Sequence, residues 1–311
     1  MAWVGAYTVF KGSVLAVVSV ALASCEGVVD DVKASPTAQL VGLVKNQPCV
    51  LTAREGRRLA GAYLRQPVAA KGYDPIFVTG RITRKGLTRN VAFDDRAIRR
   101  LRPLQDEDGF EGSRSSIAVA RASFGMRADL PKVYDLTYST RKIDYEGPLV
   151  LGRSAAGFEV PTSGSQVFSG RVEMELTRPG GEAQPLLGQF TFTAGYGSKR
   201  GVMDVAGITG EGASDLGFIQ LTWDQLFLCG TRFVSSGQGS LKAQTPDDGP
   251  VLAPFQTGRE PVPLRATFEA TQFAPPDRPG PPTSLGGVFV LESDVGTLSA
   301  VFLSEEVKAA E

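Results

Sequence analysis

The sequence of 311 residues contains no histidine, and it has only 3 cysteines, 4 methionines and 2 tryptophans. Histidine is the most frequent general base near neutral pH and a frequent ligand of transition metals. Its absence therefore excludes Ser-His-Asp hydrolases, histidine-bearing zinc sites and His-ligated haem. No two cysteines have the Cys-x-x-Cys spacing of a redox motif or a thiolate zinc site. Catalysis by lysine, tyrosine or carboxylates remains possible on this ground, but no motif of the sequence supports a metal site, a cofactor or a catalytic residue, and none is predicted.

The net charge is zero, because 33 basic residues balance 33 acidic ones. This balance argues against a nucleic-acid partner for the chain as a whole. The two halves differ, however, since residues 26–150 hold 21 basic and 15 acidic residues, whereas residues 151–311 hold 11 basic and 18 acidic residues. The chain is therefore interpreted as a basic N-terminal unit followed by an acidic C-terminal unit.

The first 25 residues have the pattern of an export signal. Lys11 precedes an apolar run, Val14–Leu22, that has the length of a signal-peptide core and is too short to span a bilayer as a helix. The run ends in Leu22-Ala23-Ser24-Cys25, which resembles the lipobox of bacterial lipoproteins. This resemblance implies that residues 1–24 are removed and that Cys25 becomes the lipidated N-terminus. The alternative is an ordinary secretory signal with a chance cysteine.

Lipidation of Cys25 would attach the protein to a membrane, because several acyl chains on one residue are enough for stable anchoring. The next residue is Glu26 rather than aspartate, so the inner-membrane retention signal of many Gram-negative lipoproteins is missing. We therefore predict an outer-membrane location, with the chain either surface-exposed or facing the periplasm. Residues 25–37 are mostly small or polar and are interpreted as a tether between the lipid and the fold.

Two cysteines remain in the mature chain, Cys49 and Cys229. Disulfides form in the oxidising compartments that exported proteins reach, so an even pair of cysteines makes a disulfide plausible. Such a bond would link the basic unit to the acidic unit. Two buried free thiols are the alternative.

The chain is predicted to be all-β. The basic unit, residues 38–145, is expected to be a small and irregular β-rich domain. Its candidate strands are residues 39–44, 49–52, 58–64, 75–83, 117–124 and 133–138. A helix is predicted over Asp94–Leu101, where an aspartate can cap a short turn that ends before Pro103.

The acidic unit, residues 146–311, shows the alternation of apolar and polar residues that is typical of strands with one face in water. Phe190 and Phe192 alternate with threonines. In the segment 264–271, apolar residues such as Phe268 alternate with polar residues such as Glu269, and the polar residues are expected to face water. About eight short antiparallel strands favour a closed up-and-down β-barrel, because closure removes exposed strand edges. A β-sandwich is the alternative.

Several short motifs follow one another along the acidic unit, namely Val160–Gly170, Phe190–Phe192, Gly201–Val205, Ala266–Phe268, Phe273–Pro276 and Leu285–Phe289. These motifs and their order resemble the transferrin-binding-protein-like lipoproteins, whose barrel domain is similar to that of the complement factor H-binding lipoproteins. The resemblance covers roughly residues 155–305. It implies an eight-stranded barrel on a surface-exposed or periplasm-facing lipoprotein that binds a macromolecule or a nutrient carrier. It does not specify the ligand.

The densest basic segment of the chain lies in the N-terminal unit and forms the candidate electrostatic patch. Its basic residues are Arg81, Arg84, Lys85, Arg89, Arg96, Arg99, Arg100 and Arg102. Such a segment could meet an acidic protein, the phosphates of lipopolysaccharide or the membrane surface. The alternative is a solvated face that pairs with the acidic barrel.

Three functions of different classes remain open at this point. The first is an outer-membrane-anchored, non-catalytic binding protein for an extracellular or periplasmic protein or a nutrient-carrier ligand of the iron-carrier kind. The second is a periplasmic envelope-structural or inhibitor lipoprotein without a nutrient ligand, since small barrels serve many unrelated functions. An enzyme that uses carboxylates or a Ser-Lys pair is a third hypothesis, which a pair of perturbed carboxylates in a cleft would favour.

Overall fold

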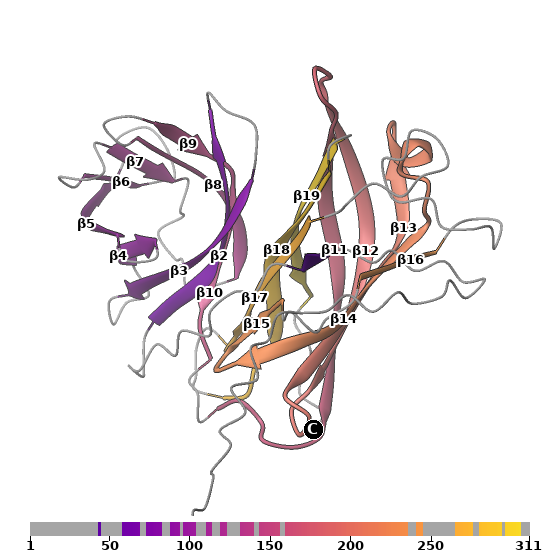
Figure 1. Ribbon diagram of the computed structural model, residues 1–311. Helices are drawn as coiled ribbons and strands as arrows, with labels where there is room; N and C mark the ends of the chain where they lie inside the picture. The colour runs from indigo at the N-terminus through magenta and orange to yellow at the C-terminus, as the bar shows by residue number, and fades with distance from the viewer. Residues whose placement is uncertain are drawn as a thin grey trace, which may run out of the picture.

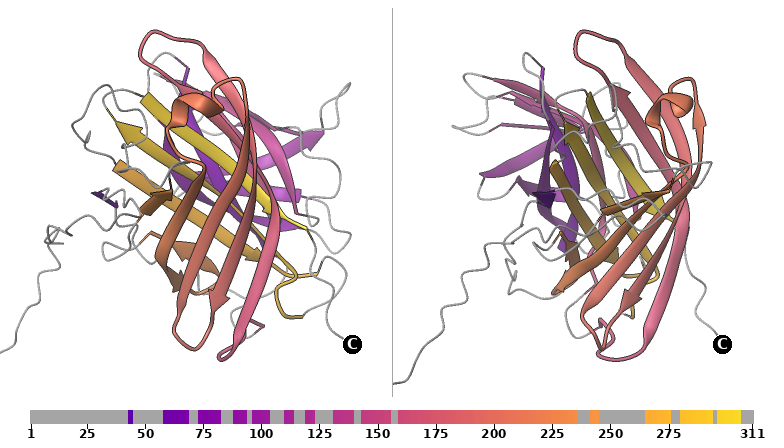
Figure 2. Two further views of the ribbon diagram at one scale, coloured as in Figure 1. Left: turned by 90° about the vertical axis from the view of Figure 1, so that its right-hand side faces the viewer. Right: turned by 45° about the vertical axis from the view of Figure 1, so that its right-hand side comes forward.

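The computed structural model of the chain contains two rings of β-strands that lie against each other (Figures 1 and 2). It describes residues 43–44, 58–68, 73–82, 88–93, 96–103, 110–113, 119–122, 131–139, 143–155, 159–235, 241–244, 265–275, 280–293 and 296–305. No helix within these ranges has the length and apolar character that crossing a bilayer requires.

The C-terminal ring is a closed eight-stranded antiparallel barrel. Its strands in order around the ring are β11 (Ser165–Thr177), β12 (Ala183–Gly195), β13 (Arg200–Gly210), β14 (Gln220–Cys229), β15 (Arg232–Val234), β17 (Arg265–Phe273), β18 (Ser284–Ser293) and β19 (Gly296–Ser304). Strand β19 pairs with β11, which closes the ring. Two short strands, β1 (Leu43–Val44) on β17 and β16 (Leu241–Gln244) on β14, add to it, and a 3-10 turn, η1 (Ala213–Leu216), follows β13. The predicted up-and-down barrel is confirmed.

Aromatic side chains fill the inside of this barrel. They come from the inward positions of the alternating strands and include Phe168, Phe190, Phe192, Trp223, Phe233, Phe268, Phe289 and Phe302, all buried. The ring centroids of Phe192 and Phe233 lie 4.7 Å apart, and those of Phe190 and Phe302 lie 5.0 Å apart in an edge-to-face arrangement. Such contacts add to the free energy gained from burying apolar area. The barrel interior is therefore a packed core.

The N-terminal strands form a second ring. Its members are β2 (Arg58–Pro67), β3 (Asp74–Ile82), β4 (Thr88–Phe93), β5 (Arg96–Pro103), β6 (Phe110–Ser113), β7 (Val119–Ala122), β8 (Lys132–Ser139) and β10 (Pro148–Arg153). Strand β10 pairs with both β2 and β8 and closes this ring, while β9 (Asp144–Glu146) pairs with β8 and β2. The N-terminal unit is thus more regular than the sequence suggested. Its ring includes β10, which follows residue 145.

The helix predicted over Asp94–Leu101 is wrong. Residues from Arg96 to Pro103 form β5, which pairs with β4 in an antiparallel hairpin. The capping and proline signals on which the helix prediction rested are local, whereas hairpin pairing satisfies the backbone hydrogen bonds of both segments at once.

The two rings share an apolar contact made by the outer face of the barrel strands β17–β19 and by β2 and β10. The cluster consists of Ala62, Leu64, Val150, Phe273, Val288, Val290 and Val301. The packing is close, since a Cβ placed on Gly286 would lie 2.6 Å from a methyl group of Val150. The prediction that Glu269 faces water is therefore wrong, because the N-terminal ring covers this side of the barrel and leaves Glu269 fully buried.

A buried ion pair lies at the same contact. The guanidinium of Arg232 donates from Nε to Oε1 of Glu269 at 2.7 Å and from Nη2 to Oε2 at 2.6 Å. The same guanidinium stacks over the ring of Phe77 in β3, 3.8 Å from its centroid. Two charges that lose their water need this bidentate geometry, since each would otherwise be left unpaired in an apolar interface. The pair links barrel strands β15 and β17 and, through Phe77, the N-terminal ring.

Candidate functional site

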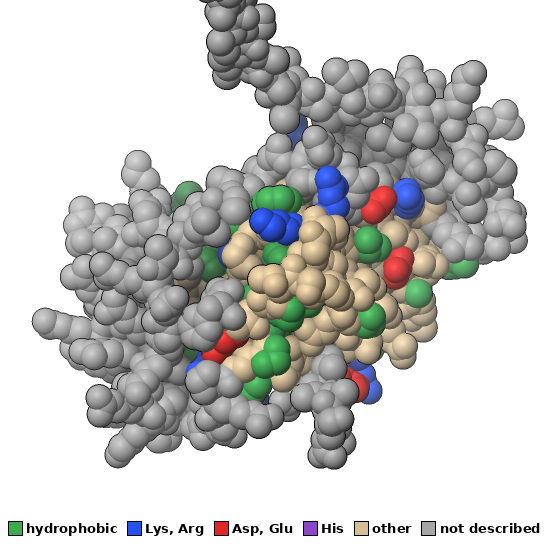
Figure 3. Space-filling model, turned by 90° about the horizontal axis from the view of Figure 1, so that it is seen from below, with side chains coloured by type: hydrophobic (Ala, Val, Ile, Leu, Met, Phe, Trp, Pro, Cys, Tyr) green, Lys and Arg blue, Asp and Glu red, His purple; other side chains and the backbone are tan. Residues whose placement is uncertain are grey.

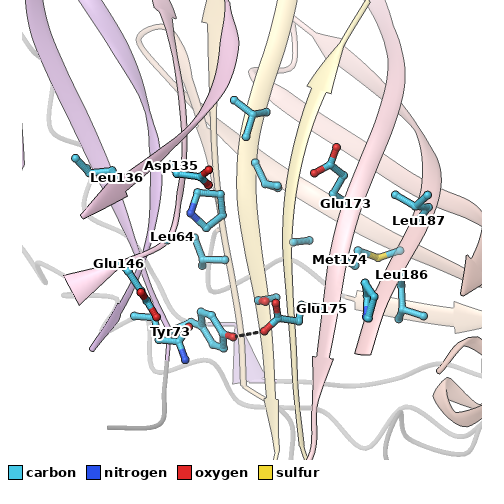
Figure 4. A pocket seen from close by; sticks show the side chains of 18 of the residues that line it. Leu64, Tyr73, Asp135, Leu136, Glu146, Glu173, Met174, Glu175, Leu186 and Leu187 are labelled. Carbon is cyan, nitrogen blue, oxygen red and sulfur yellow. Dashed lines mark hydrogen bonds between the residues drawn. The ribbon is translucent and has the colours of Figure 1, made fainter. Parts of the chain in front are cut away.

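A cleft of about 530 Å³ lies where the N-terminal ring meets the side of the barrel. Strands β2, β8 and β10 with Tyr73 and Glu146 form one wall, and β11, β12 and β19 form the other (Figure 4). We call it the inter-ring cleft. It is lined by Leu64, Gln66, Tyr73, Val133, Asp135, Leu136, Thr137, Glu146, Gly147, Pro148, Glu173, Met174, Glu175, Pro185, Leu186, Leu187, Ser299, Ala300 and Val301.

Four carboxylates line the inter-ring cleft, two from each wall. Asp135 and Glu146 belong to the N-terminal ring, and Glu173 and Glu175 belong to β11 of the barrel. The two glutamates alternate with buried residues of β11, so their side chains point away from the barrel core and toward the cleft. The described lining includes neither lysine nor arginine. The cleft therefore carries a concentration of negative charge.

Apolar side chains lie among these carboxylates. Val133 on β8 is 40 % exposed and Leu187 on β12 is 58 % exposed, although both are large aliphatic residues. Deeper in the cleft, Leu64 and Val301 are buried in the apolar cluster between the rings. The surface of the cleft thus combines negative charge with exposed apolar area, a combination that favours ligands with both positive and apolar groups.

One hydrogen bond crosses the cleft from wall to wall. The hydroxyl of Tyr73, just before β3, donates to Oε1 of Glu175 at 2.9 Å (Figure 4). Oε1 also lies 3.4 Å from the hydroxyl of Thr177, which can donate to it. Burial of Tyr73 raises the pKa of its phenol, and the negative charge of Glu175 raises it further. Tyr73 therefore stays protonated and fixes Glu175 as an acceptor.

The chemistry that this arrangement supports is recognition of positive charge. In the described ranges, no group of three or more His, Cys, Asp or Glu side chains has the geometry to hold a metal ion. The carboxylates lie on two walls, and one of them is held by Tyr73. They can accept hydrogen bonds from ammonium or guanidinium groups of a ligand that enters between the rings.

Two further hollows are present, one next to the inter-ring cleft and one at an end of the barrel. One of about 270 Å³ shares Gln66 and Tyr73 with the inter-ring cleft and continues it toward Arg178 and Glu292. The other, of about 490 Å³, lies between β13, η1 and β14 and is lined mainly by small and apolar residues such as Ile208. Figure 2 shows η1 beside one end of the barrel strands. Since the inter-ring cleft combines charge with apolar area, it is the best candidate site.

The underside of the molecule offers no similar concentration of charge in its described part (Figure 3). Basic and acidic side chains occur together on this face, and hydrophobic side chains are scattered over it. Single exposed hydrophobic residues are usual on protein surfaces and do not mark a binding site.

The fold is similar to that of solved transferrin-binding proteins. Intact Ap-TbpB with its N and C lobes is 15 % identical with a TM-score of 0.42, and the match covers 80 % of this chain and 46 % of that one. A TbpB mutant from Haemophilus parasuis Hp5 is also 15 % identical, with a TM-score of 0.43 and coverages of 80 % and 46 %. TbpB of serogroup B Neisseria meningitidis is 14 % identical, with a TM-score of 0.39 and coverages of 80 % and 43 %.

The chain thus spans less than half the length of these solved structures. No protein-family model matches the chain, and no curated protein matches it. At this identity and TM-score the likeness concerns the fold and says nothing about a ligand.

Most of the residues singled out from the sequence lie away from the inter-ring cleft. Arg81 is in β3, Arg89 is in β4, and the remaining described members of the basic patch are in β5. These members are Arg96, Arg99, Arg100 and Arg102. Strands β3, β4 and β5 are neighbours, and β3 also contacts barrel strands β17 and β18, whereas β4 and β5 lie farther from the barrel (Figure 1). Arg84, Lys85, Cys25 and Cys49 lie outside the described residues.

Cys229 is buried at the end of β14 and is disulfide-bonded. Because Cys49 is outside the described residues, the pairing of these two cysteines stays a prediction.

Sequence analysis did not identify the cleft residues Tyr73, Asp135, Glu146, Glu173 and Glu175 as a site. The alternation along β11 does indicate that Glu173 and Glu175 point outward. Their partners on the other wall come from a separate ring, however, and no local pattern indicates which outward face meets which ring.

Proposed function

We propose that the chain is a lipoprotein, anchored in the outer membrane through Cys25, that binds a macromolecular ligand without catalysing a reaction. The observation that carries the binding function is the inter-ring cleft, in which exposed apolar side chains lie among four carboxylates. The lipobox-like run before Cys25 supports the anchor. The resemblance of the acidic unit to transferrin-binding-protein-like lipoproteins suggests a nutrient carrier as the ligand.

A binding role fits the cleft better than an acid–base role. Glu175 is engaged by the protonated hydroxyl of Tyr73, and exposed carboxylates on two separate walls do not form the close, desolvated pair that acid–base catalysis uses. Carboxylates spread over both walls instead suit the recognition of a charged surface.

The first test is protease treatment of intact cells that express the chain, with a periplasmic protein as an internal control. If the chain is surface-exposed, it is cut while the periplasmic protein survives. The Cys25→Ala chain is expected to leave the membrane fraction, because it lacks the thiol that carries the lipid. Recovery of this variant in the membrane fraction at the wild-type level would contradict the anchor.

The alternative function is a periplasmic structural or inhibitor lipoprotein, which the same fold could serve. It predicts that the chain is cut only after the outer membrane is broken. In that case the ligand is to be sought among periplasmic proteins.

We further propose that Cys229 is bonded to Cys49. Cys229 is buried and disulfide-bonded, and an exported chain whose Cys25 is acylated keeps Cys49 as the other cysteine. Peptide mapping without reduction would reveal a peptide that joins the two residues.

A further inference from the structure

We propose that the inter-ring cleft binds an extended segment of a partner protein in which lysine or arginine alternates with apolar residues. This inference rests on the proposed binding function and specifies the chemistry of its ligand. It follows from three features of the cleft, namely three carboxylates that pair with no described residue, the spacing of the glutamates on β11 and the exposed apolar residues.

The charge of the cleft is not neutralised from within. Asp135, Glu146 and Glu173 are exposed, and their carboxylates make no hydrogen bond or ion pair within the described part of the chain. Like charges held in one cleft with low-dielectric walls raise the local concentration of cations and steer a basic partner toward the site. A ligand that brings ammonium or guanidinium groups would supply the missing partners.

The spacing of the carboxylates matches an extended chain. Glu173 and Glu175 are two residues apart on β11 and lie on the same face of the strand, so their positions repeat at about 6.7 Å. An extended peptide has the same repeat, and alternate side chains point to the same side. Basic residues at every second position can therefore reach both glutamates.

The other face of such a segment needs an apolar surface, and the opposite wall provides one. Val133 is 40 % exposed there, and Leu136 and Pro148 line the cleft beside it. The volume of about 530 Å³ lies within the range of about 300–1,000 Å³ that is typical of ligand sites. It suits a few residues of an extended segment that enters between the two walls.

The probe for this proposal is a labelled peptide of alternating lysine and valine, titrated against the full-length chain purified in detergent. Binding is measured by fluorescence anisotropy. The peptide is expected to bind the wild-type chain and to bind less well as ionic strength rises, because salt screens exposed charges. A peptide with glutamate in place of lysine is expected not to bind.

The variant Asp135→Asn/Glu173→Gln removes one carboxylate from each wall while keeping side-chain size. It is expected to weaken binding about fivefold, because each exposed ion pair contributes only a small factor to affinity. Glu211→Gln/Glu305→Gln is the matched control, since it removes two exposed carboxylates outside the cleft. This control is expected to bind the peptide like the wild-type chain.

Three results would overturn the proposal. They are absence of binding by the wild-type chain, equal weakening by the cleft variant and the control variant, and equal binding of a peptide whose lysines and valines are grouped in two blocks. The last result would indicate general attraction to polycations. The peptide assay uses purified protein, so a negative result there does not bear on the membrane anchor or on surface exposure, which the protease experiment tests. A negative result in the protease experiment likewise does not bear on peptide binding.

Discussion

Replacement of Glu269 by glutamine is expected to destabilise the protein strongly, because it leaves the guanidinium of Arg232 without its counter-ion in a buried interface. Glu269 is fully buried, and Arg232 is 5 % exposed. The carboxylate accepts two hydrogen bonds, at 2.7 and 2.6 Å. Glutamine has a similar shape and can accept one of these bonds, but it carries no negative charge.

The size of the effect follows from the burial of the pair. Breaking a buried ion pair by removing one partner costs about 3–5 kcal/mol. Since glutamine keeps one acceptor oxygen, we expect a loss of about 3 kcal/mol, at the lower end of this range. A loss of this size is a large fraction of the free energy of unfolding of a typical domain, about 5–15 kcal/mol.

The double variant Arg232→Met/Glu269→Met separates the burial of a charge from the loss of packing. It removes both charges, so no unpaired ion remains in the interface, and such replacements are often neutral or stabilising. It also removes the stacking of Arg232 on Phe77, which is worth about 0.5–2 kcal/mol. We therefore expect the double variant to be more stable than Glu269→Gln alone.

Urea unfolding followed by the fluorescence of Trp223, which is buried in the barrel core, measures these differences. The slope with urea should be the same for all chains, so that the midpoints report stability. A loss below about 1 kcal/mol for Glu269→Gln, within the range of exposed ion pairs, would refute the reasoning. A double variant that is less stable than the single one would refute it as well.

Three further predictions concern packing, protonation and the disulfide. Gly61→Ala is expected to prevent correct pairing of β2 with β10 and to lower the melting temperature, because its Cβ would overlap a backbone oxygen of β10. The control Gly197→Ala, which has open space around it, should leave the melting temperature nearly unchanged. Equal melting temperatures of the two variants would contradict this reasoning. The pKa of Tyr73 is raised above its ordinary value of 10.0 by burial and by a neighbouring carboxylate. The contribution of the protonated phenol to stability is therefore complete below pH 10 and is lost as the pH rises through the raised pKa. The free energy of unfolding of Tyr73→Phe should therefore fall less in alkaline solution than that of the wild-type chain. Parallel pH profiles of the two chains would argue against this role of Tyr73. If Cys49 and Cys229 are bonded, replacing either by serine should cost about 4–5 kcal/mol of stability, because the bond closes a loop of about 180 residues. Replacing both should cost no more, since each replacement removes the same bond. Additive losses in urea unfolding would exclude the bond.

The sequence predicted the barrel well because the relevant pattern is local. Residues that alternate along β11 and β12 have their inward positions set by the geometry of a strand, whatever surrounds it. Phe190 and Phe192 were therefore correctly assigned to the core. The prediction over Asp94–Leu101 failed for the opposite reason, because pairing of β4 with β5 depends on two segments and outweighs a weak local preference for helix.

The candidate site could be predicted only in part. The outward direction of Glu173 and Glu175 is apparent from the alternation along β11. The contact of Tyr73 with Glu175 joins residues 102 positions apart, and it depends on how one ring packs against the other. The basic patch was easier to identify because it is continuous in sequence, and its described members lie on three neighbouring strands, β3, β4 and β5.

The sequence by itself determined the all-β class and the inward residues of the barrel, since each depends on composition or on a short repeat, whereas the export signal at the N-terminus stays a prediction. The tertiary structure decided the rest. Packing of the two rings buried the outer face of β17–β19, enclosed the pair of Arg232 and Glu269, and opened the inter-ring cleft beside it. The physical reason is that a strand has two faces, and its own sequence does not specify which element packs against each face.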